Sequence, residues 1–122
     1  MILNELAIVE FTENISANTF QTFLKSPKIA ASTKPGQFIN ILPSKNWGEM
    51  MRRPMSVSSQ KDNVISIIYK VVGHGTQLMQ NWSVGDTVDL IGPLGNYWHG
   101  YSDKLSILIG GGVGIAPIIN LN

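Results

Sequence analysis

Residues 61–82 read KDNVISIIYKVVGHGTQLMQNW and contain the clearest strand and helix signals of the chain. Val64 to Val72 is rich in β-branched and aromatic residues and follows the hairpin-type turn Asp62-Asn63, so it predicts the longest strand of the chain. Beyond it, apolar residues at helical spacing predict a short helix from Thr76 to Trp82, with Thr76 as its N-cap. The stretch therefore indicates a strand joined to a short helix by a glycine turn.

Similar runs of strand-forming residues, separated by turn residues, occur on both sides of this stretch. Lys34-Pro35-Gly36 has Pro and Gly where a β-turn requires them. Six strands of this length must close or cover their edges, which a small barrel does. We therefore expect an all-β fold, a six-stranded antiparallel Greek-key barrel with one short helix. The strands are predicted at Leu6 to Thr12, Thr19 to Lys25, Gln37 to Leu42, Met55 to Ser59, Val64 to Val72 and Thr87 to Ile91.

The last twenty or so residues have a different pattern. Lys104 to Ile109 is apolar without alternation, as expected for a strand covered on both faces in a parallel sheet. Gly110 to Gly114 follows, and Ile115 to Leu121 predicts the first turns of a helix. Strand, glycine loop and helix open a nucleotide-binding α/β unit. We expect residues 1–101 to form the barrel domain and 102–122 to begin a truncated α/β domain.

Composition excludes several classes of protein. The 122 residues are 43% hydrophobic and 14% charged with a net charge of +1, which predicts a soluble domain without nucleic-acid or membrane partners. The count of zero cysteines excludes disulfides and thiolate-held metals or clusters in this chain. Met1 to Glu10 lacks the basic segment of a signal peptide, so a cytoplasmic location is expected.

Arg52-Arg53-Pro54-Met55-Ser56 stands at the head of the fourth predicted strand. A planar guanidinium offers paired donors that suit a diphosphate. Ser56, predicted in the inward-facing phase of that strand, has a hydroxyl for a ring nitrogen or carbonyl. A basic turn followed by an ordinary strand serine explains the same residues equally well.

Gly73-His74-Gly75-Thr76 is the second candidate motif. Its glycines let the backbone approach a ligand, and the predicted helix start at Thr76 turns N–H groups toward an anion. A simple tight turn is the alternative interpretation. His74 and His99 have no partner at metal-ligand spacing, so we expect neither to bind a metal.

Gly110 to Pro117, GGGVGIAP, is the third motif and departs from the dinucleotide-binding pattern G-x-G-x-x-G. Its position between a predicted strand and a predicted helix favours nucleotide binding, whereas a hinge between domains is the alternative.

The order of these motifs resembles the ferredoxin–NADP reductase superfamily. R-P-x-S occurs at 53–56, I-Y-K at 68–70, G-x-G-T at 73–76, G-P-L-G at 92–95 and G-G-G-x-G-x-x-P at 110–117. Within that superfamily the chain is similar to the electron-transfer subunits of the NAD-dependent class of dihydroorotate dehydrogenase, and the likeness covers the whole chain. The resemblance implies an FAD-binding barrel at 1–101 and the start of an NAD-binding domain at 102–122.

The resemblance also implies the cofactor contacts. Arg53 would meet the diphosphate of FAD, Ser56 would approach the reactive edge of the isoalloxazine, and Met55 replaces an aromatic residue of many relatives. Neither a catalytic residue nor a metal ligand is expected. The full set of implied cofactor-binding residues is Arg53, Pro54, Met55 and Ser56, then Ile68, Tyr69 and Lys70, then Gly75 and Thr76, and finally Gly111, Gly112 and Gly114 at the meeting point of nicotinamide and flavin.

For full-length relatives the resemblance implies electron transfer from NADH to FAD and onward through a [2Fe–2S] cluster on a cysteine-rich tail. The acceptor would be the dihydroorotate dehydrogenase catalytic subunit of pyrimidine biosynthesis. We do not expect this chain to turn over alone. Residues from Leu105 onward are expected to pair with a neighbouring copy or to be poorly ordered, because an apolar patch there would be exposed.

Two other functions stay open. One is a reductase subunit of a related system, serving a hydrogenase or a ferredoxin-dependent transhydrogenase. The other is a non-catalytic β-barrel that acts as a docking module.

Overall fold

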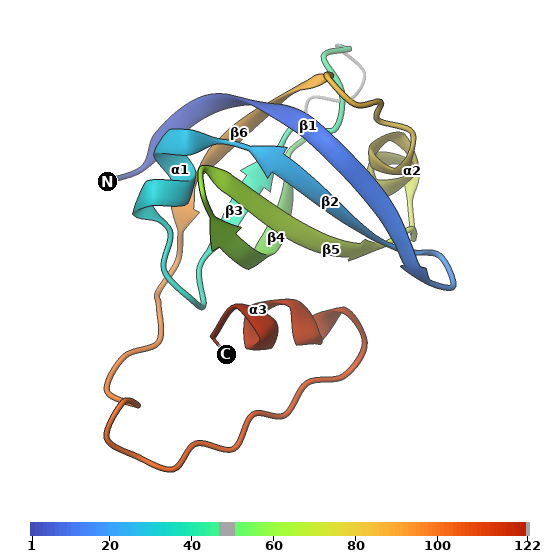
Figure 1. Ribbon diagram of the computed structural model, residues 1–122. Coiled ribbons are helices and arrows are strands. Elements are labelled where there is room, and N and C mark those ends of the chain that lie inside the picture. Colours follow the sequence, from blue (N-terminus) through green and yellow to red (C-terminus); the bar gives the residue numbers. More distant parts are fainter. Residues whose placement is uncertain (47–50, 122) are drawn as a thin grey trace.

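The computed structural model describes residues 1–46 and 51–121. Within these residues six strands close into an antiparallel barrel in the order β1-β2-β5-β4-β3-β6 (Figure 1). Three of the neighbouring pairs, β2–β5, β3–β6 and β6–β1, join strands that are not consecutive along the chain, as in a Greek key. The predicted fold class is therefore confirmed. The strands are β1 (Leu3–Ser16), β2 (Thr19–Lys25), β3 (Phe38–Ile41), β4 (Arg53–Lys61), β5 (Val64–Lys70) and β6 (Thr87–Leu94).

The β4–β5 hairpin places two distant motifs at one end of the barrel. Lys61 pairs with Val64, so Asp62 and Asn63 alone form the turn. Their φ angles of 51° and 70° are both positive, as a type I′ hairpin turn requires. Because the strands are antiparallel, the start of β4 lies beside the end of β5. The predicted hairpin turn is confirmed.

Three strands run further than predicted, and strand pairing explains the extensions. β4 spans Arg53–Lys61 instead of Met55 to Ser59, because Arg53 pairs with Ile41 and Lys61 with Val64. β1 continues to Ser16, which pairs with Thr19 across a two-residue turn in which Asn18 has a φ of 51°. β6 continues past Gly92-Pro93 to Leu94, which pairs with Phe38 of β3. Turn residues alone marked the ends too early, because the neighbouring strands supply partners beyond them.

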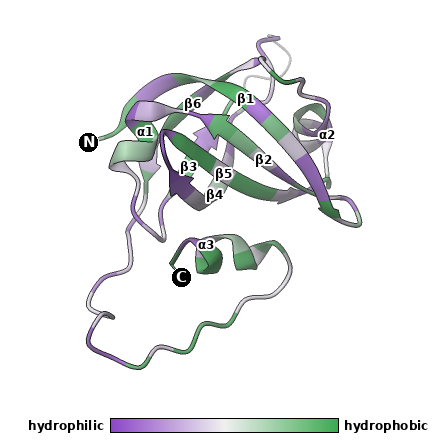
Figure 2. Cartoon of the chain, in the orientation of Figure 1, coloured by the Kyte–Doolittle hydropathy of each residue, from purple (hydrophilic) through white to green (hydrophobic). Residues whose placement is uncertain are grey.

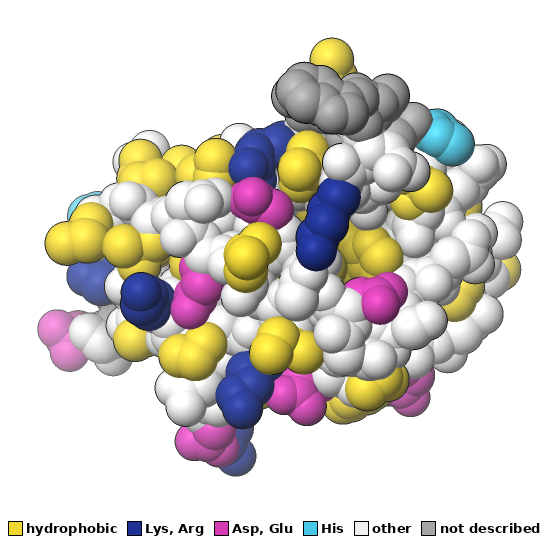
Figure 3. Space-filling model, turned by 90° about the horizontal axis from the view of Figure 1, so that it is seen from above, with side chains coloured by type: hydrophobic (Ala, Val, Ile, Leu, Met, Phe, Trp, Pro, Cys, Tyr) yellow, Lys and Arg dark blue, Asp and Glu magenta, His cyan; other side chains and the backbone are white. Residues whose placement is uncertain are grey.

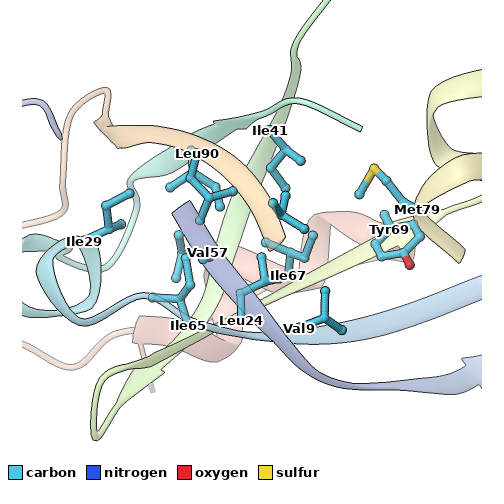
Figure 4. Packing of buried hydrophobic residues seen from close by; sticks show 13 residues of the cluster. Val9, Leu24, Ile29, Ile41, Val57, Ile65, Ile67, Tyr69, Met79 and Leu90 are labelled. Carbon is cyan, nitrogen blue, oxygen red and sulfur yellow. The ribbon is translucent and has the colours of Figure 1, made fainter. Parts of the chain in front are cut away.

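Two short helices lie at opposite ends of the barrel (Figure 1). They are α1 (Pro27–Ser32) and α2 (His74–Gln80). Each contributes a fully buried side chain to the same core, Ile29 from α1 and Met79 from α2 (Figure 4). α1 was not predicted, because Ser26-Pro27 directly follows the predicted strand Thr19 to Lys25 and is also typical of the end of a strand. Proline is also favoured at the first position of a helix, and here it occupies that position.

Between these helices the barrel interior is filled by aliphatic and aromatic side chains (Figure 4). They alternate along the strands with outward-facing residues, which is the pattern of a closed sheet with one buried face. The buried cluster comprises Ala7, Val9, Leu24, Ile29, Ile39, Ile41, Val57, Ile65, Ile67, Tyr69, Met79, Val88 and Leu90.

The strand predicted at Lys104 to Ile109 is wrong, because these residues adopt no strand. A parallel strand needs neighbours reached through crossover connections, and the described residues beyond 109 are only loop and helical turns. Leu105, Ile107 and Ile109 are consequently 97%, 82% and 84% exposed.

The helix expected after the glycine loop is present as α3 (Ile115–Leu121), preceded by a 3₁₀ turn at Gly112–Gly114. It packs against β4 from outside the barrel, with Ala116 only 1% exposed (Figure 1). Figure 2 shows the apolar character of this helix. Asn122, the last residue of the predicted second domain, lies outside the described residues.

The surface seen from above carries mixed charges. Figure 3 shows Lys and Arg side chains interspersed with Asp, Glu and apolar side chains on this face. Such mixing gives no extended field of one sign there. Among the described helices, none is long and apolar enough to cross a membrane.

Glu5 of β1 connects the barrel wall to α1. Its carboxylate accepts hydrogen bonds from the Ser26 hydroxyl and from the backbone N–H groups of Lys28, at 3.1 Å, and Ile29, at 3.0 Å. Partial burial acts to raise the pKa of Glu5. The hydrogen bonds and the charge of Lys28 outweigh this effect, so the pKa lies below its ordinary value.

We predict a pH-dependent loss of stability for Glu5→Gln. A lowered carboxyl pKa stabilises the fold at neutral pH, and this stabilisation disappears as the pH falls through the folded-state pKa. In urea denaturation at pH 7 the variant should therefore be less stable by about 1 kcal/mol. At pH 3 the difference should shrink. Glu10→Gln, at an exposed position of the same strand, is the control, and an equal deficit for Glu5→Gln at both pH values would contradict the assignment.

Candidate functional site

A pocket of about 240 Å³ lies where the start of β4 meets the turn between β5 and α2. It is lined by both the Arg-Pro-Met motif and the glycine turn, because the antiparallel β4–β5 hairpin places the start of β4 beside the end of β5. Gly73 and His74 of the candidate glycine motif also line it, although they are not among the implied cofactor-binding residues. Val72 was not predicted, and its position next to the glycine turn is the signal that identifies it. The lining residues are Arg53, Pro54, Met55, Val72, Gly73, His74, Gly75 and Thr76.

Arg53 and Gly75 are in direct contact in this pocket. A Cβ atom added at Gly75 would lie 2.5 Å from Nε and 2.8 Å from Cζ of Arg53. These separations are far below van der Waals contact, so a side chain at position 75 would displace the guanidinium. The absence of a Cβ at Gly75 therefore lets the guanidinium lie directly on the backbone of the turn. Arg53 also donates to the backbone oxygen of Met51, which holds its side chain near the start of β4.

Thr76 holds the glycine turn in shape. Its Oγ1 accepts hydrogen bonds from the backbone N–H groups of Val72 at 3.0 Å and Gly73 at 3.2 Å, and it donates to the Gly73 carbonyl at 3.1 Å. The prediction of Thr76 as N-cap is wrong, because α2 begins at His74 with Gly73 as the N-cap. Gly73 has no side chain that could cap the helix. The Thr76 hydroxyl, inside the first turn of α2, instead hydrogen-bonds to the backbone of Gly73.

The pocket gathers hydrogen-bond donors. The N–H of Gln77 bonds to the carbonyl of Gly73, so the first turn of α2 closes at the pocket, with its N–H groups at the end of the helix that favours an anion. The guanidinium of Arg53 adds a positive charge and a planar set of donors. Such an arrangement suits an anion with several oxygen atoms, as a diphosphate has.

Residues 54 to 56 of β4 differ in orientation. Met55 and Val57 pack on the core, so alternation places the side chains of Pro54 and Ser56 on the outward face. The predicted inward phase of Ser56 is therefore wrong. Ser56 pairs with Phe38 of β3 and is half-buried.

Ile68 and Tyr69 of β5 are buried, with 7% and 2% exposure. The Tyr69 hydroxyl is 3.1 Å from Oγ1 of Thr22, and its ring lies 6.1 Å from that of Phe20. Burial raises the pKa of the Tyr69 phenol, and the hydrogen bond with Thr22 offsets part of that rise. The Tyr69 side chain is thus part of the core, whereas Lys70 is exposed at the end of the strand.

The three glycines of the C-terminal loop lie apart from this pocket. Gly111, Gly112 and Gly114 are exposed, and none is among the described residues that line it. Gly112 has a φ of 56°, and the N–H of Gly114 bonds to the Gly111 carbonyl at 3.1 Å. The structure therefore brings together Arg53 to Met55 with Gly75 and Thr76, but not with these glycines.

A larger hollow of about 600 Å³ lies at the other end of α2. Two of its polar side chains already have partners within the protein. Lys45 Nζ donates to Thr87 Oγ1 at 2.6 Å, and Trp82 Nε1 donates to the Pro43 carbonyl at 3.0 Å. Within the described part of the chain, no group of three or more His, Asp or Glu residues is placed to hold a metal.

The chain matches the family model described as the oxidoreductase FAD-binding domain over residues 6–99. It is 34% identical over 118 residues to the dihydroorotate dehydrogenase B (NAD(+)) electron transfer subunit of Fusobacterium nucleatum, covering 93% of this chain and 46% of that protein. It is 32% identical to the subunit of the same name from Geobacillus kaustophilus, covering 99% and 49%. The chain spans about half the length of these curated relatives.

Solved structures show the same likeness. An NADH-dependent reduced ferredoxin-NADP oxidoreductase matches with a TM-score of 0.84 and 31% identity, over 93% of this chain and 41% of that one. The ferredoxin reductase in carbazole 1,9a-dioxygenase matches with a TM-score of 0.81 and 25% identity, over 97% and 38%. The predicted resemblance to the ferredoxin–NADP reductase superfamily and to the dihydroorotate dehydrogenase electron-transfer subunits is confirmed.

We predict that Thr76→Val destabilises the protein by about 1–2 kcal/mol, because the variant keeps the shape but loses the hydroxyl that joins the turn to the helix. Urea denaturation measures the effect as a lower midpoint with an unchanged slope. Thr76→Ser keeps the hydroxyl and should lose less than half as much. Equal midpoints for the Val and Ser variants would show that the hydroxyl does not hold the turn.

Proposed function

The chain belongs to the oxidoreductase FAD-binding domain family, and we propose that it seats the diphosphate of FAD between Arg53 and the turn Gly73 to Thr76. The contact between Arg53 and Gly75 carries this proposal. It places a guanidinium and a side-chain-free stretch of backbone on the same pocket, which fits a group with two phosphates. When bound, FAD supplies the redox chemistry, and the protein supplies binding and orientation.

We propose that the residues beside this seat orient the rest of the cofactor. Met55 is only partly buried against the core and also lines the pocket, where its thioether is soft enough to pack on an isoalloxazine ring. Ser56, on the outward face of β4, is placed for a hydrogen bond to the ring edge. Ile68 and Tyr69 contribute backbone contacts because their side chains are buried, and Lys70 faces the ribityl chain or adenosine.

For the whole protein we propose the role named in the curated relatives, an electron-transfer subunit of NAD-dependent dihydroorotate dehydrogenase. Electrons would pass from NADH through FAD and a [2Fe–2S] cluster to the catalytic subunit in the cytoplasm. The 122 residues include no cysteine, so thiolate ligands of the cluster would come from elsewhere. Residues 102–122, with Gly111, Gly112 and Gly114, would begin the domain that brings nicotinamide to the flavin, after a barrel domain at 1–101.

One observation favours a second candidate function. The NADH-dependent reduced ferredoxin-NADP oxidoreductase is 31% identical to the chain, close to the 34% of the F. nucleatum subunit. The chain would then serve a transhydrogenase-type reductase. Identification of the catalytic subunit that co-purifies with the native protein decides between the two.

We predict that Arg53→Ala weakens FAD binding roughly 10- to 100-fold, because a charge-assisted hydrogen bond to the diphosphate is lost. Titration with FAD, followed by flavin fluorescence, measures the affinity. Gly75→Ala should weaken binding as well, since its methyl group displaces the guanidinium.

Lys61→Ala is the matched control, because it removes a cation at the other end of β4. It should bind FAD as the parent chain does. An Arg53→Ala variant that folds and binds FAD with unchanged affinity would remove the pocket from the cofactor site.

We also propose that the exposed segment from Leu105 to Ile109 mediates self-association. Three of its apolar side chains are more than four-fifths exposed, which favours contact with a second copy. Sedimentation equilibrium should show a dimer whose population rises with concentration. The variant with Leu105, Ile107 and Ile109 all changed to Ser should be monomeric, whereas a parent chain that stays monomeric at every concentration would exclude the proposal.

A further inference from the structure

The two neighbouring arginines of the sequence motif have different partners. Arg53 reaches the glycine turn, whereas Arg52 reaches β6 on the other side. Arg52 donates from Nη2 to Oδ1 of Asp89 at 2.8 Å and from Nη1 to the Asp89 backbone carbonyl at 3.2 Å. Both hydrogen bonds end on one residue, so they fix the direction of the Arg52 side chain as well as its distance.

Asp89 also bonds to two other parts of the barrel. Its Oδ1 also accepts a hydrogen bond from Nδ2 of Asn4 in β1, at 2.7 Å. Its backbone carbonyl also accepts from the N–H of Leu42, the residue after β3, at 3.0 Å. Asp89 is therefore held by β1 and by the residue after β3 as well as by Arg52.

We infer that the Arg52–Asp89 ion pair positions Arg53 for the diphosphate. Arg52 immediately precedes β4 and Arg53 is its first residue, so the two bonds of Arg52 to Asp89 of β6 fix the backbone from which Arg53 extends toward the turn between β5 and α2. Arg53 is the first residue of β4 and is paired with Ile41 of β3. The ion pair therefore holds the chain directly before the point where the strand pairing begins. The inference rests on the proposed function, because it concerns the same diphosphate seat.

The chemistry of the pair explains why arginine is needed at position 52. A lysine keeps the charge but has a single nitrogen, so it does not reproduce the two-point contact with the carboxylate and the carbonyl. The pair is partly exposed, with side-chain exposures of 25% and 28%, and such pairs add little to global stability. Loss of the pair should therefore appear in cofactor affinity more than in stability.

A double-mutant cycle on the full 122-residue chain tests this assignment. FAD affinity is measured for the parent, Arg52→Lys, Arg53→Ala and the double variant. Arg52→Lys should weaken FAD binding about 3- to 10-fold when Arg53 is present and less than about 2-fold when position 53 is Ala. Asp89→Asn should behave in the same way. The midpoint of thermal unfolding without FAD should fall by no more than about 3 °C in either variant.

Lys45→Met is the matched control. Lys45 also connects the segment between β3 and β4 to β6, through its hydrogen bond to Thr87, but it is not adjacent to Arg53 in the sequence. It should leave FAD affinity within about 2-fold of the parent. The slope of FAD affinity against salt separates positioning from direct contact. It should stay unchanged in Arg52→Lys and Asp89→Asn, whereas it should fall in Arg53→Ala.

Three results would overturn the inference. The first is an FAD affinity equal to that of the parent in both Arg52→Lys and Asp89→Asn. The second is an equal loss of FAD affinity on Arg52→Lys substitution whether position 53 is Arg or Ala. The third is a lower salt slope in Asp89→Asn, where both arginines remain. Unchanged affinity in Arg53→Ala alone would instead contradict the proposed diphosphate seat. The failure of one claim is thus distinguishable from the failure of the other.

Discussion

The contact between the Arg53 guanidinium and the backbone at Gly75 is the constraint on which the site depends. It requires a residue without a Cβ, since an added Cβ would lie 2.5 Å from Nε of Arg53. It also requires that two segments far apart in the sequence end at the same place. The two-residue turn between β4 and β5 achieves this, because it fixes the register that sets Arg53 beside the chain leaving β5.

The rest of the barrel supports that contact from several sides. Thr76 holds the turn through three hydrogen bonds, and Met79 in the same helix is fully buried in the core. The turn is thus attached to the barrel interior at the end of the barrel opposite α1 (Figure 1). On the β4 side, Arg52 anchors on Asp89, which is itself bonded to β1 and to the residue after β3. The two halves of the pocket therefore rest on separate parts of one closed sheet.

Much of this architecture could be predicted from the sequence, because hydrophobic alternation and turn residues are local signals. The hairpin at Asp62-Asn63 is an example, since both residues tolerate the positive φ that the turn requires. Residues 104–109 show where local signals fail, because an apolar run forms a strand only where a neighbouring strand supplies hydrogen-bond partners, and these residues adopt none. Side-chain direction was equally hidden. Neighbouring arginines look alike in a sequence, and the burial of Tyr69 follows from long-range packing against Thr22 and Phe20.

The most direct test of the central claim is a crystal structure of the chain grown with FAD. The diphosphate oxygen atoms should lie within hydrogen-bond distance of both the Arg53 guanidinium and the backbone N–H groups of the turn that contains Gly75. A diphosphate bound to only one of these groups, or seated on another face of the barrel, would contradict it.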